Sequence, residues 1–362
     1  KNKNLVKAVL AAASAYLYIN IAVFMVAFQG IVKAYSDHNP VIVNMVYLIP
    51  NLVTIPFILI SGKLCTWFSK KSLLITGLII FALAGTGAML YENIIYVMIM
   101  RALLGVGMGI LYPLARALAV QYFEGKERTS VLGLMQATTC GFGIVLAPIS
   151  GQIAMINYRY TMLIYLIALL IAIFAAVVLP KDTPERLIYQ ETEGKQILPG
   201  YGTSYFIFLA GVFVVSIFLV VNQLKLSIFV TSQNLGTSAD VGLINSIIFI
   251  AGFFAGLLFS KFYSLTKRYS VVIACLIDGI GLLIVYKAYS LIAVYIGNVL
   301  IGAFIGVMQP YFTTRVSALV PKARATMAIT YLGVVYSFSY FSASYIVPVL
   351  ESIFKASDVR AS

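Results

Sequence analysis

The sequence contains few charged residues, which make up 10% of its 362 positions. A soluble domain carries about 25%, so too few charges are present to cover a water-exposed surface. Hydrophobic residues make up 61% of the chain, and the mean hydropathy is +0.99. We therefore exclude a soluble globular protein and expect most of the surface to contact lipid.

Acidic residues are the scarcer charge, with 12 Asp and Glu against 25 Lys and Arg and a net charge of +13. Most basic residues fall in short segments between apolar runs, where they set membrane orientation and contact anionic lipid headgroups. We therefore expect membrane lipids, and no nucleic acid, as partners. The three cysteines and the single histidine show no metal-ligand spacing, so we expect no metal and no other cofactor.

Motifs for chemistry or nucleotide binding are also absent. The sequence has no phosphate-binding G-x-x-x-x-G-K-[ST] loop, which excludes drive by ATP, and no H-E-x-x-H motif. The apolar runs contain no Ser/His pair and no pair of carboxylates that could act as acid and base. We therefore expect that the chain is not an enzyme.

Apolar runs of about 20 residues, long enough to cross a bilayer, recur along the chain. Barrel strands would alternate polar and apolar residues over about 10 positions, whereas runs such as Met162–Leu179 do not alternate. The sequence therefore predicts an all-α membrane protein. The predicted spans are 5–33, 41–62, 72–90, 94–122, 129–154, 159–180, 203–231, 239–263, 269–288, 291–314 and 325–347. The first run is too long for a signal peptide, so we expect it to be a retained span.

An internal repeat relates the two parts of the chain. The segment Arg101–Pro113 matches Asn298–Pro310, so that Gly105 falls on Gly302 and Gly109 on Gly306. Repeated halves of this kind build a central site that opens to alternate sides in many transporters. We expect a six-helix bundle at 1–180, a cytoplasmic linker at 181–202 and a second bundle at 203–362. The second copy is one helix short, so we expect eleven spans and a missing twelfth.

Lys and Arg are distributed unevenly between alternate loops. With the N-terminus in the cytoplasm, the inside loops hold about three times as many of them as the outside loops. This asymmetry has the same sign in both halves. We therefore expect a multi-pass protein of the cytoplasmic (plasma) membrane, with a cytoplasmic N-terminus and a monomeric state.

Three motifs carry a resemblance to a known family. They are the loop Gly62-Lys-Leu-Cys-Thr-Trp-Phe-Ser-Lys70-Lys71, the segment Arg101-x-x-Leu-Gly105-x-Gly107-x-Gly109, and Gly143-Ile-Val-Leu-Ala147-Pro148-Ile-Ser-Gly151. The chain resembles the major facilitator superfamily, and in these motifs its drug–proton antiporter branch. The resemblance implies two pseudo-symmetric six-helix bundles, a bacterial cell membrane, and an arginine at position 101 that assists proton transfer. In the loop, Thr66 stands where the family has an Asp that takes part in holding the outward-open state.

Two cations inside the spans are candidates for substrate contact. A guanidinium at depth costs about 2.5–3.5 kcal/mol or more, so Arg101 is expected to face a wet cavity or a partner, on one helical face with Tyr112. Lys225 shares a polar face with Asn222. Alternatively, Arg101 is a structural cation bonded to carbonyls and Lys225 reaches the outer interface. The remaining candidates for substrate binding are Tyr16, Asn20, Gln136 and Asn298.

Coupling and gating are assigned to a separate set of residues. Asp278 is the one carboxylate that we place well inside a span, so it and Arg101 are the candidates for proton coupling, although Asp278 can equally pack or pair within the bundle. The glycine pairs allow close helix approach, and a proline within a helix bends it. The gating and motif set comprises Gly62, Lys70, Lys71, Gly105, Gly109, Gly143 and Pro148.

The function predicted from these features is secondary active transport by alternating access, with efflux of an amphipathic compound or drug as the leading interpretation. The first alternative is uptake or exchange of an organic anion read by Arg101 and Lys225. The second is a lipid-handling or signalling membrane protein without solute turnover. The expected partner is a small-molecule substrate, with protons as a candidate coupling ion.

Overall fold

The computed structural model describes residues 2–16, 18–20, 23, 31, 34–37, 39–180, 182, 202–233, 235–236, 238–321 and 324–353. These residues form helices and contain no strand. Eleven α-helices and two 3-10 segments are described: α1 Lys3–Ser14, α3 Pro40–Leu64, α4 Lys70–Gly87, α5 Ile94–Tyr122, α6 Gly125–Ile156, η1 Tyr158–Leu166, α7 Ile167–Val178, α9 Thr203–Ser232, α10 Ser238–Thr266, η2 Lys267–Tyr269, α11 Ser270–Tyr286, α12 Leu291–Leu319 and α13 Ala325–Ile353. The all-α prediction is confirmed, and a helix overlaps each predicted span, although most helices extend beyond the predicted bounds.

Polar side chains at the predicted turns begin several helices by binding backbone N–H groups that lack a partner in the helix. Asn93 accepts from the N–H groups of Ile95 and Tyr96 at the start of α5. Ser69 and Ser290 cap α4 and α12 in the same way. One difference from the prediction is that the sixth span begins as the 3-10 segment η1 before it continues as α7.

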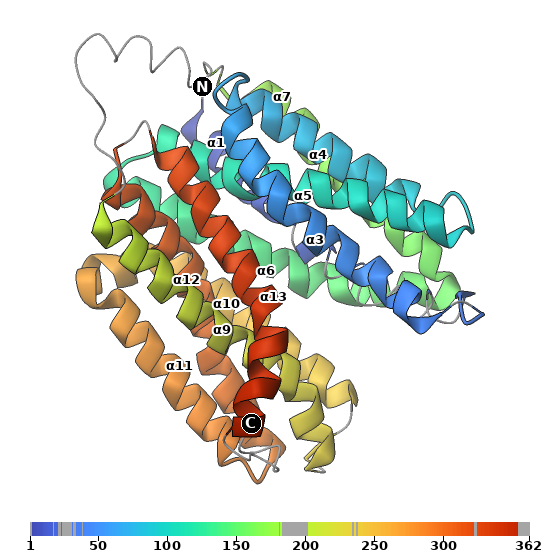
Figure 1. Cartoon of the computed structure of the whole chain (residues 1–362). Coiled ribbons are helices and arrows are strands. Elements are labelled where there is room, and N and C mark those ends of the chain that lie inside the picture. The colour runs from blue at the N-terminus through green and yellow to red at the C-terminus, as the bar shows by residue number, and fades with distance from the viewer. Residues whose placement is uncertain are drawn as a thin grey trace.

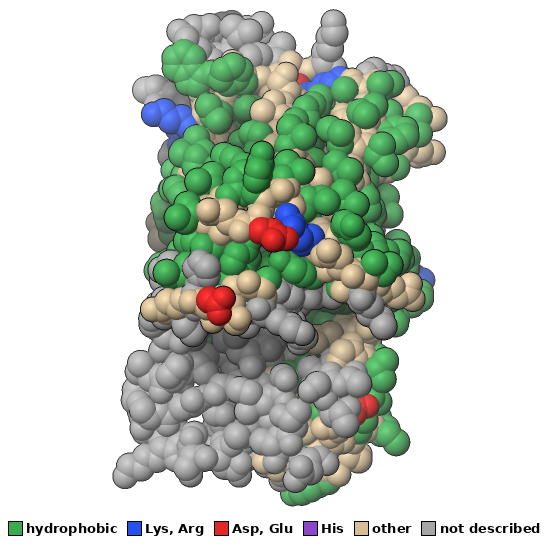
Figure 2. All heavy atoms as spheres, turned by 90° about the vertical axis from the view of Figure 1, so that its right-hand side faces the viewer, with side chains coloured by type: hydrophobic (Ala, Val, Ile, Leu, Met, Phe, Trp, Pro, Cys, Tyr) green, Lys and Arg blue, Asp and Glu red, His purple; other side chains and the backbone are tan. Residues whose placement is uncertain are grey.

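The helices cross back and forth, so one end of the bundle collects the basic loops. We call this the basic end: α1, α4 and α6 begin there, and Lys63, Lys70, Lys126 and Lys267 lie there. Six segments of the described residues are long and apolar enough to cross a membrane. Hydrophobic side chains cover most of the described surface on the side of the first half in Figure 2, and Leu83, Leu170 and Phe174 of that half are each more than half exposed. Such a surface is suited to lipid.

The helices group into two halves (Figure 1), residues up to 182 on one side and residues from 202 on the other. One hydrophobic core links α1, α4, α5 and α7 of the first half. Another links α9, α12 and α13 of the second half and also includes Ala117 and Val120 of α5. Across the boundary, α6 packs on α10 and α3 packs on α13. Figure 1 shows α3 and α13 close together at the basic end and diverging toward the opposite end.

Candidate functional site

Arg101 is buried inside the first half, with 3% of its surface exposed. Its Nε donates to the carbonyl oxygen of Val46 in α3 at 3.2 Å, and one terminal nitrogen donates to Asn20 Oδ1 at 3.3 Å. The same nitrogen lies 3.2 Å from the hydroxyl of Tyr165 in η1, which itself donates to Asn20 Oδ1 at 2.9 Å. The guanidinium thus joins four segments of one half, and the structure brings the predicted residues Arg101 and Asn20 together.

Aromatic rings support this network from one side. Phe81 packs edge-on against Tyr165, with ring centroids 5.3 Å apart, and against Tyr16 at 5.9 Å. A Cβ atom on Gly85 would lie 2.3 Å from the ring of Tyr165, so α4 needs a glycine at this contact. Tyr16 is 3% exposed, and a substrate contact by Tyr16 stays a prediction.

A small pocket lies between the two halves, about 15 Å from the basic end at 1.5 Å per helical residue. The first half contributes residues of α1, α5 and α6 to it, and the second half contributes residues of α12. Its lining comprises Ser14, Arg116, Leu132, Met135, Gln136, Thr139, Gln309, Pro310 and Thr313. The pocket therefore combines one cation, two amides and three hydroxyls with an apolar wall. Its volume of about 10 Å³ is room for about one water molecule, so it is closed in this structure.

Arg116 reaches across the boundary between the halves. One terminal nitrogen donates to the carbonyl oxygen of Tyr112, one turn earlier on α5, at 3.1 Å, and the other lies 3.5 Å from Gln309 Oε1 on α12. The guanidinium carbon lies over the ring of Tyr112, 4.9 Å from its centroid. That ring packs on α13, where a Cβ atom on Gly333 would lie 2.4 Å from it. The predicted residue Tyr112 is thus at the boundary, next to the pocket.

Gln136 is the predicted site residue that lines the pocket directly. It is 7% exposed, and its Nε2 lies 3.6 Å from Cys140 Sγ. Beside it, Ser14 and Thr139 share a hydrogen bond of 3.1 Å, which ties α1 to α6. The hydroxyl groups at the base of the pocket are therefore held by helix–helix contacts, while the Gln136 amide makes only a weak contact with sulfur.

The other polar candidates lie apart from the pocket. Asn298 is fully buried in α12 and donates to the carbonyl oxygen of Val294 in its own helix at 2.9 Å. Asp278 on α11 is 7% exposed, and its Oδ1 has no hydrogen-bond partner among the described residues. The side chains of Asn222 and Lys225 fall outside the described residues, so their roles stay predictions.

The glycines of the internal repeat make the same contact in each half. A Cβ atom on Gly105 would lie 2.5 Å from the carbonyl oxygen of Pro50 in α3, and one on Gly302 would lie 2.5 Å from that of Ile248 in α10. Gly109 and Gly306 repeat the contact one turn later, again with α3 and α10. The expectation that these small residues permit close helix approach is confirmed.

The signature loop between α3 and α4 contacts both halves. A Cβ atom on Gly62 would lie 2.7 Å from Thr330 Oγ1 of α13, so this glycine allows the halves to meet. Lys70 Nζ donates to Gln121 at the end of α5, and Lys71 Nζ donates to carbonyl oxygens at the end of α7. The carboxylate of Asp182 accepts from the backbone N–H groups of Lys70 and Lys71, which caps α4.

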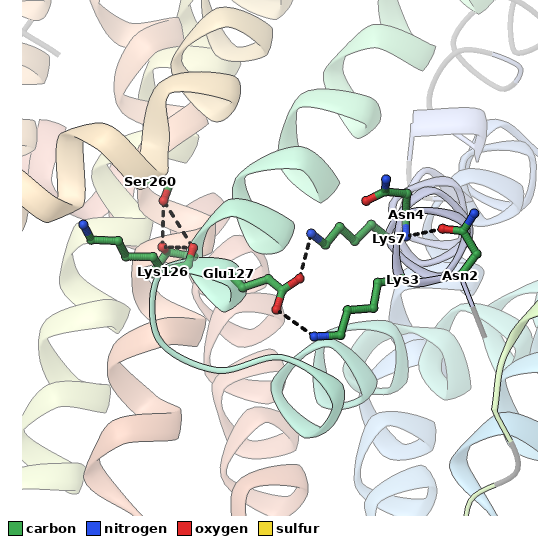
Figure 3. A network of polar contacts seen from close by, with 8 residues as sticks. Asn2, Lys3, Asn4, Lys7, Lys126, Glu127 and Ser260 are labelled. Carbon is green, nitrogen blue, oxygen red and sulfur yellow. Dashed lines mark hydrogen bonds and ion pairs between the residues drawn. The ribbon is translucent and has the colours of Figure 1, made fainter.

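The halves are pressed together at the basic end by α6 and α10. A Cβ atom on Gly133 would lie 2.4 Å from the carbonyl oxygen of Gly256. Figure 3 shows Ser260 of α10 beside the start of α6: its Oγ lies 3.3 Å from the carbonyl oxygen of Lys126 and 2.9 Å from Thr129 Oγ1.

On the other side of the same turn, Lys3 and Lys7 of α1 form ion pairs with Glu127 at 3.6 and 2.8 Å (Figure 3). Glu127 lies in the first turn of α6, where a negative charge is favoured. The start of α6 is thus tied to both α1 and α10.

Farther along α6, the third motif faces both halves. A Cβ atom on Gly143 would lie 3.0 Å from Tyr18 of the first half and 3.4 Å from Phe249 of the second. Pro148 is exposed, and α6 continues past it to Ile156. Near the opposite end, Gly151 and Gly242 have open space where a Cβ atom would be. The contact of α6 with the second half thus extends from Gly133 to Gly143, and Gly151 lies beyond it.

Sequence reasoning did not name Tyr165 or the pocket residues Ser14, Thr139 and Thr313 as site residues. The sequence feature that could have identified Tyr165 is its hydroxyl within a strongly apolar run. A hydroxyl in that position needs a hydrogen-bond partner in lipid. The position of Arg116 near the end of its span does not by itself show that the second half meets it there.

These features define the class of this chain. It is a multi-pass helical membrane protein with two similar halves and a polar pocket between them. The family model described as the Major Facilitator Superfamily matches residues 10–344. The chain belongs to this superfamily, as the motifs predicted.

Its relatives and structural neighbours agree with this assignment. A triacylglyceride transporter of Mycolicibacterium smegmatis is 27% identical over 53% of this chain and 38% of its own length, and the multidrug transporter protein MdtP of Bacillus subtilis is 31% identical over 36% and 24%. The matched part thus spans well under half of these curated relatives. Among solved structures, the human organic anion transporter MFSD10 has a TM-score of 0.80 at 11% identity, covering 100% of this chain and 96% of that one. FucP in the outward conformation has a TM-score of 0.74 at 13% identity, covering 99% and 93%.

Proposed function

We propose that the chain is a secondary active transporter that moves a small amphipathic molecule by alternating access. The observation that carries this proposal is the pocket at Arg116, whose lining comes from both halves. Because its two sides belong to different bundles, relative motion of the halves would assemble or open it, as alternating access requires. Glycine contacts hold the basic end closed. Toward the opposite end α3 and α13 diverge (Figure 1), while α6 and α10 stay in contact as far as Gly143.

Efflux of a drug-like compound is the leading activity. The pocket combines apolar side chains, Leu132 and Met135, with a few polar groups, which suits an amphipathic cargo. Several relatives carry names of multidrug resistance proteins, including MdtL of Shewanella oneidensis at 28% identity over 39% of this chain. With the basic end in the cytoplasm, the structure corresponds to a state closed toward the cytoplasm.

Proton coupling is part of this proposal and is assigned to Asp278. It is the one buried carboxylate among the described residues, and a buried carboxylate with an unsatisfied oxygen is suited to holding a proton. Its position on α11, away from the pocket, implies that any coupling acts through movement of the second half and not through contact with the cargo.

A lipid is the second candidate cargo, because one relative is named a triacylglyceride transporter. Counterflow into proteoliposomes decides between them. The panel contains ethidium, a naphthalene carboxylate and a short-chain triacylglycerol, each with and without a pH gradient. We expect counterflow of a water-soluble amphiphile; uptake of the lipid alone would favour the second candidate, and no counterflow of any compound would refute transport.

A further inference from the structure

We propose that the pocket at Arg116 is a subsite for an anionic group, a carboxylate or its analogue, carried by an amphipathic substrate. This inference rests on the proposed transport function and names the substrate chemistry of the same site. It differs from the prediction that Arg101 and Lys225 read an anion, because the described contacts of Arg101 lie within the first half.

The hydrogen-bonding capacity of Arg116 supports an incoming anion. A guanidinium has five N–H donors and no acceptor. The contacts of Arg116 with described residues use two of them, one to the Tyr112 carbonyl oxygen at 3.1 Å and one to Gln309 at the long distance of 3.5 Å. A carboxylate can accept two parallel N–H groups of one guanidinium. The side chain therefore has donors available for a ligand on the pocket side.

The charge of Arg116 also requires compensation at this depth. Among the described residues, the ion pairs join Lys3 and Lys7 to Glu127, and Arg159 to Glu92; none involves Arg116. A half-buried cation balanced only by neutral oxygens and a ring face is costly in a membrane. An anion from the substrate would supply the missing negative charge. A buried Asp or Glu in its place would have to remain desolvated even when the site is empty.

The surrounding groups match the rest of such a molecule in their chemistry, and the pocket of about 10 Å³ must widen to admit it. The Gln136 amide can donate to an anionic oxygen, while Leu132, Met135 and the Tyr112 ring provide apolar surface beside it. Gln309 comes from the second half, so an anion that replaces its long contact with Arg116 would be held from both sides of the boundary. The negative charge of the substrate is thus bound at the boundary between the moving halves. Binding of the anion is therefore coupled to closure of the two halves around it.

The test compares three amphiphiles that differ in their charge: 2-naphthylacetate, its neutral amide 2-naphthylacetamide, and the cation 2-naphthylethylamine. Binding to the purified full chain in nanodiscs is measured by equilibrium dialysis. We expect the wild type to bind the carboxylate at least tenfold more tightly than the amide or the amine. Arg116→Gln should bring all three within about twofold, a loss of preference of about fivefold or more, equivalent to about 1 kcal/mol or more.

Two further variants separate charge from geometry and from folding. Arg116→Lys keeps the charge but loses the planar fork, so we expect it to retain a reduced preference of about threefold. Arg128→Gln is the matched control: Arg128 lies at the same end of the bundle on α6, donates to the Phe123 carbonyl oxygen, and does not line the pocket. It should bind all three compounds as the wild type does.

The outcomes distinguish this inference from the transport function. A wild type without preference for the carboxylate overturns the subsite, and so does an Arg116→Gln protein that keeps the preference. If Arg116→Gln does not fold, the wild-type preference and Arg116→Lys still decide. If ethidium counterflow is the same with and without Arg116, and no carboxylate preference is found, the transport function is supported and the subsite is refuted. If the carboxylate binds through Arg116 but no compound shows counterflow, the subsite is supported and the transport function is refuted.

Discussion

Two arginines on the same helix have opposite surroundings. Arg101, near the end of α5 opposite the basic end, contacts oxygens of α3, η1 and the segment after α1, all in the first half. Arg116, about 22 Å farther along the helix axis at 1.5 Å per residue, contacts its own helix and Gln309 of the second half. In the proposed alternating-access cycle, contacts within one half persist while the halves move, whereas contacts across the boundary change. We infer that Arg101 keeps the first half rigid and that Arg116 belongs to the moving site.

The second half shows how far the repeat extends. Asn298 occupies the position that matches Arg101, but it donates to Val294 of its own helix and is fully buried. The glycine contacts one and two turns later are the same in both halves. The helix packing has therefore been retained, while the polar group at the matched position has not.

The largest effect on stability is expected for Arg101→Leu. It removes three hydrogen bonds of a charged donor and leaves the Val46 carbonyl oxygen and Asn20 without that partner in a buried site. The cost should be about 3 kcal/mol. Unfolding in SDS titrations, followed by circular dichroism, measures it. Asn298→Leu is the matched control, expected to cost less than about 1 kcal/mol. Equal costs would show that the Arg101 network does not hold the first half together.

The next largest effect is expected for a variant that prevents closure of the two halves at the basic end. The Arg116 site depends on this closure, whereas the Arg101 network does not. In Gly133→Val, the added Cβ would lie 2.4 Å from the Gly256 carbonyl oxygen, so α6 and α10 must separate. An overlap of this kind costs about 1–3 kcal/mol, which corresponds to a loss of counterflow of roughly five- to 150-fold.

The control for closure is Gly151→Val. This residue lies on the same helix, in open space where a Cβ atom meets nothing within 4 Å. Its counterflow should match the wild type. If Gly133→Val also transports at the wild-type rate, the contact between α6 and α10 is not part of the cycle.

A smaller effect tests the hydroxyl of Tyr165 within the Arg101 network. Tyr165→Phe keeps the ring that packs on Phe81 and Gly85 but removes two hydrogen bonds, the one to Asn20 and the one from Arg101. Hydrogen bonds between membrane helices contribute about 0.6 kcal/mol on average, so the loss should be about 1 kcal/mol in the same SDS titration. A loss as large as that of Arg101→Leu would mean that the hydroxyl, not the guanidinium, organises the network.

The helices and their packing could be predicted from the sequence because each depends on a local or repeated signal. The apolar runs gave the spans, Asn93 marked the start of α5, and the small residues at Gly105 and Gly302 marked close helix contacts. The partners of Arg101 and Arg116 could not be predicted, because they depend on which segments meet far apart in the chain. Tyr165 is 64 residues from Arg101, and Gln309 is 193 residues from Arg116.

The smallest change in stability is expected for Arg116→Leu. A change close to zero would distinguish Arg116 clearly from Arg101. The variant loses one bond within its own helix and one long contact, and it also removes the cost of holding a cation at depth. These contributions oppose each other, so the free energy of unfolding should change by less than about 0.5 kcal/mol. The SDS titration used for Arg101→Leu measures both variants on one scale. A destabilisation of several kcal/mol would instead show that folding needs Arg116 in the empty site. Arg116 would then have the structural role that Arg101 has, and its donors would not be available to bind a substrate.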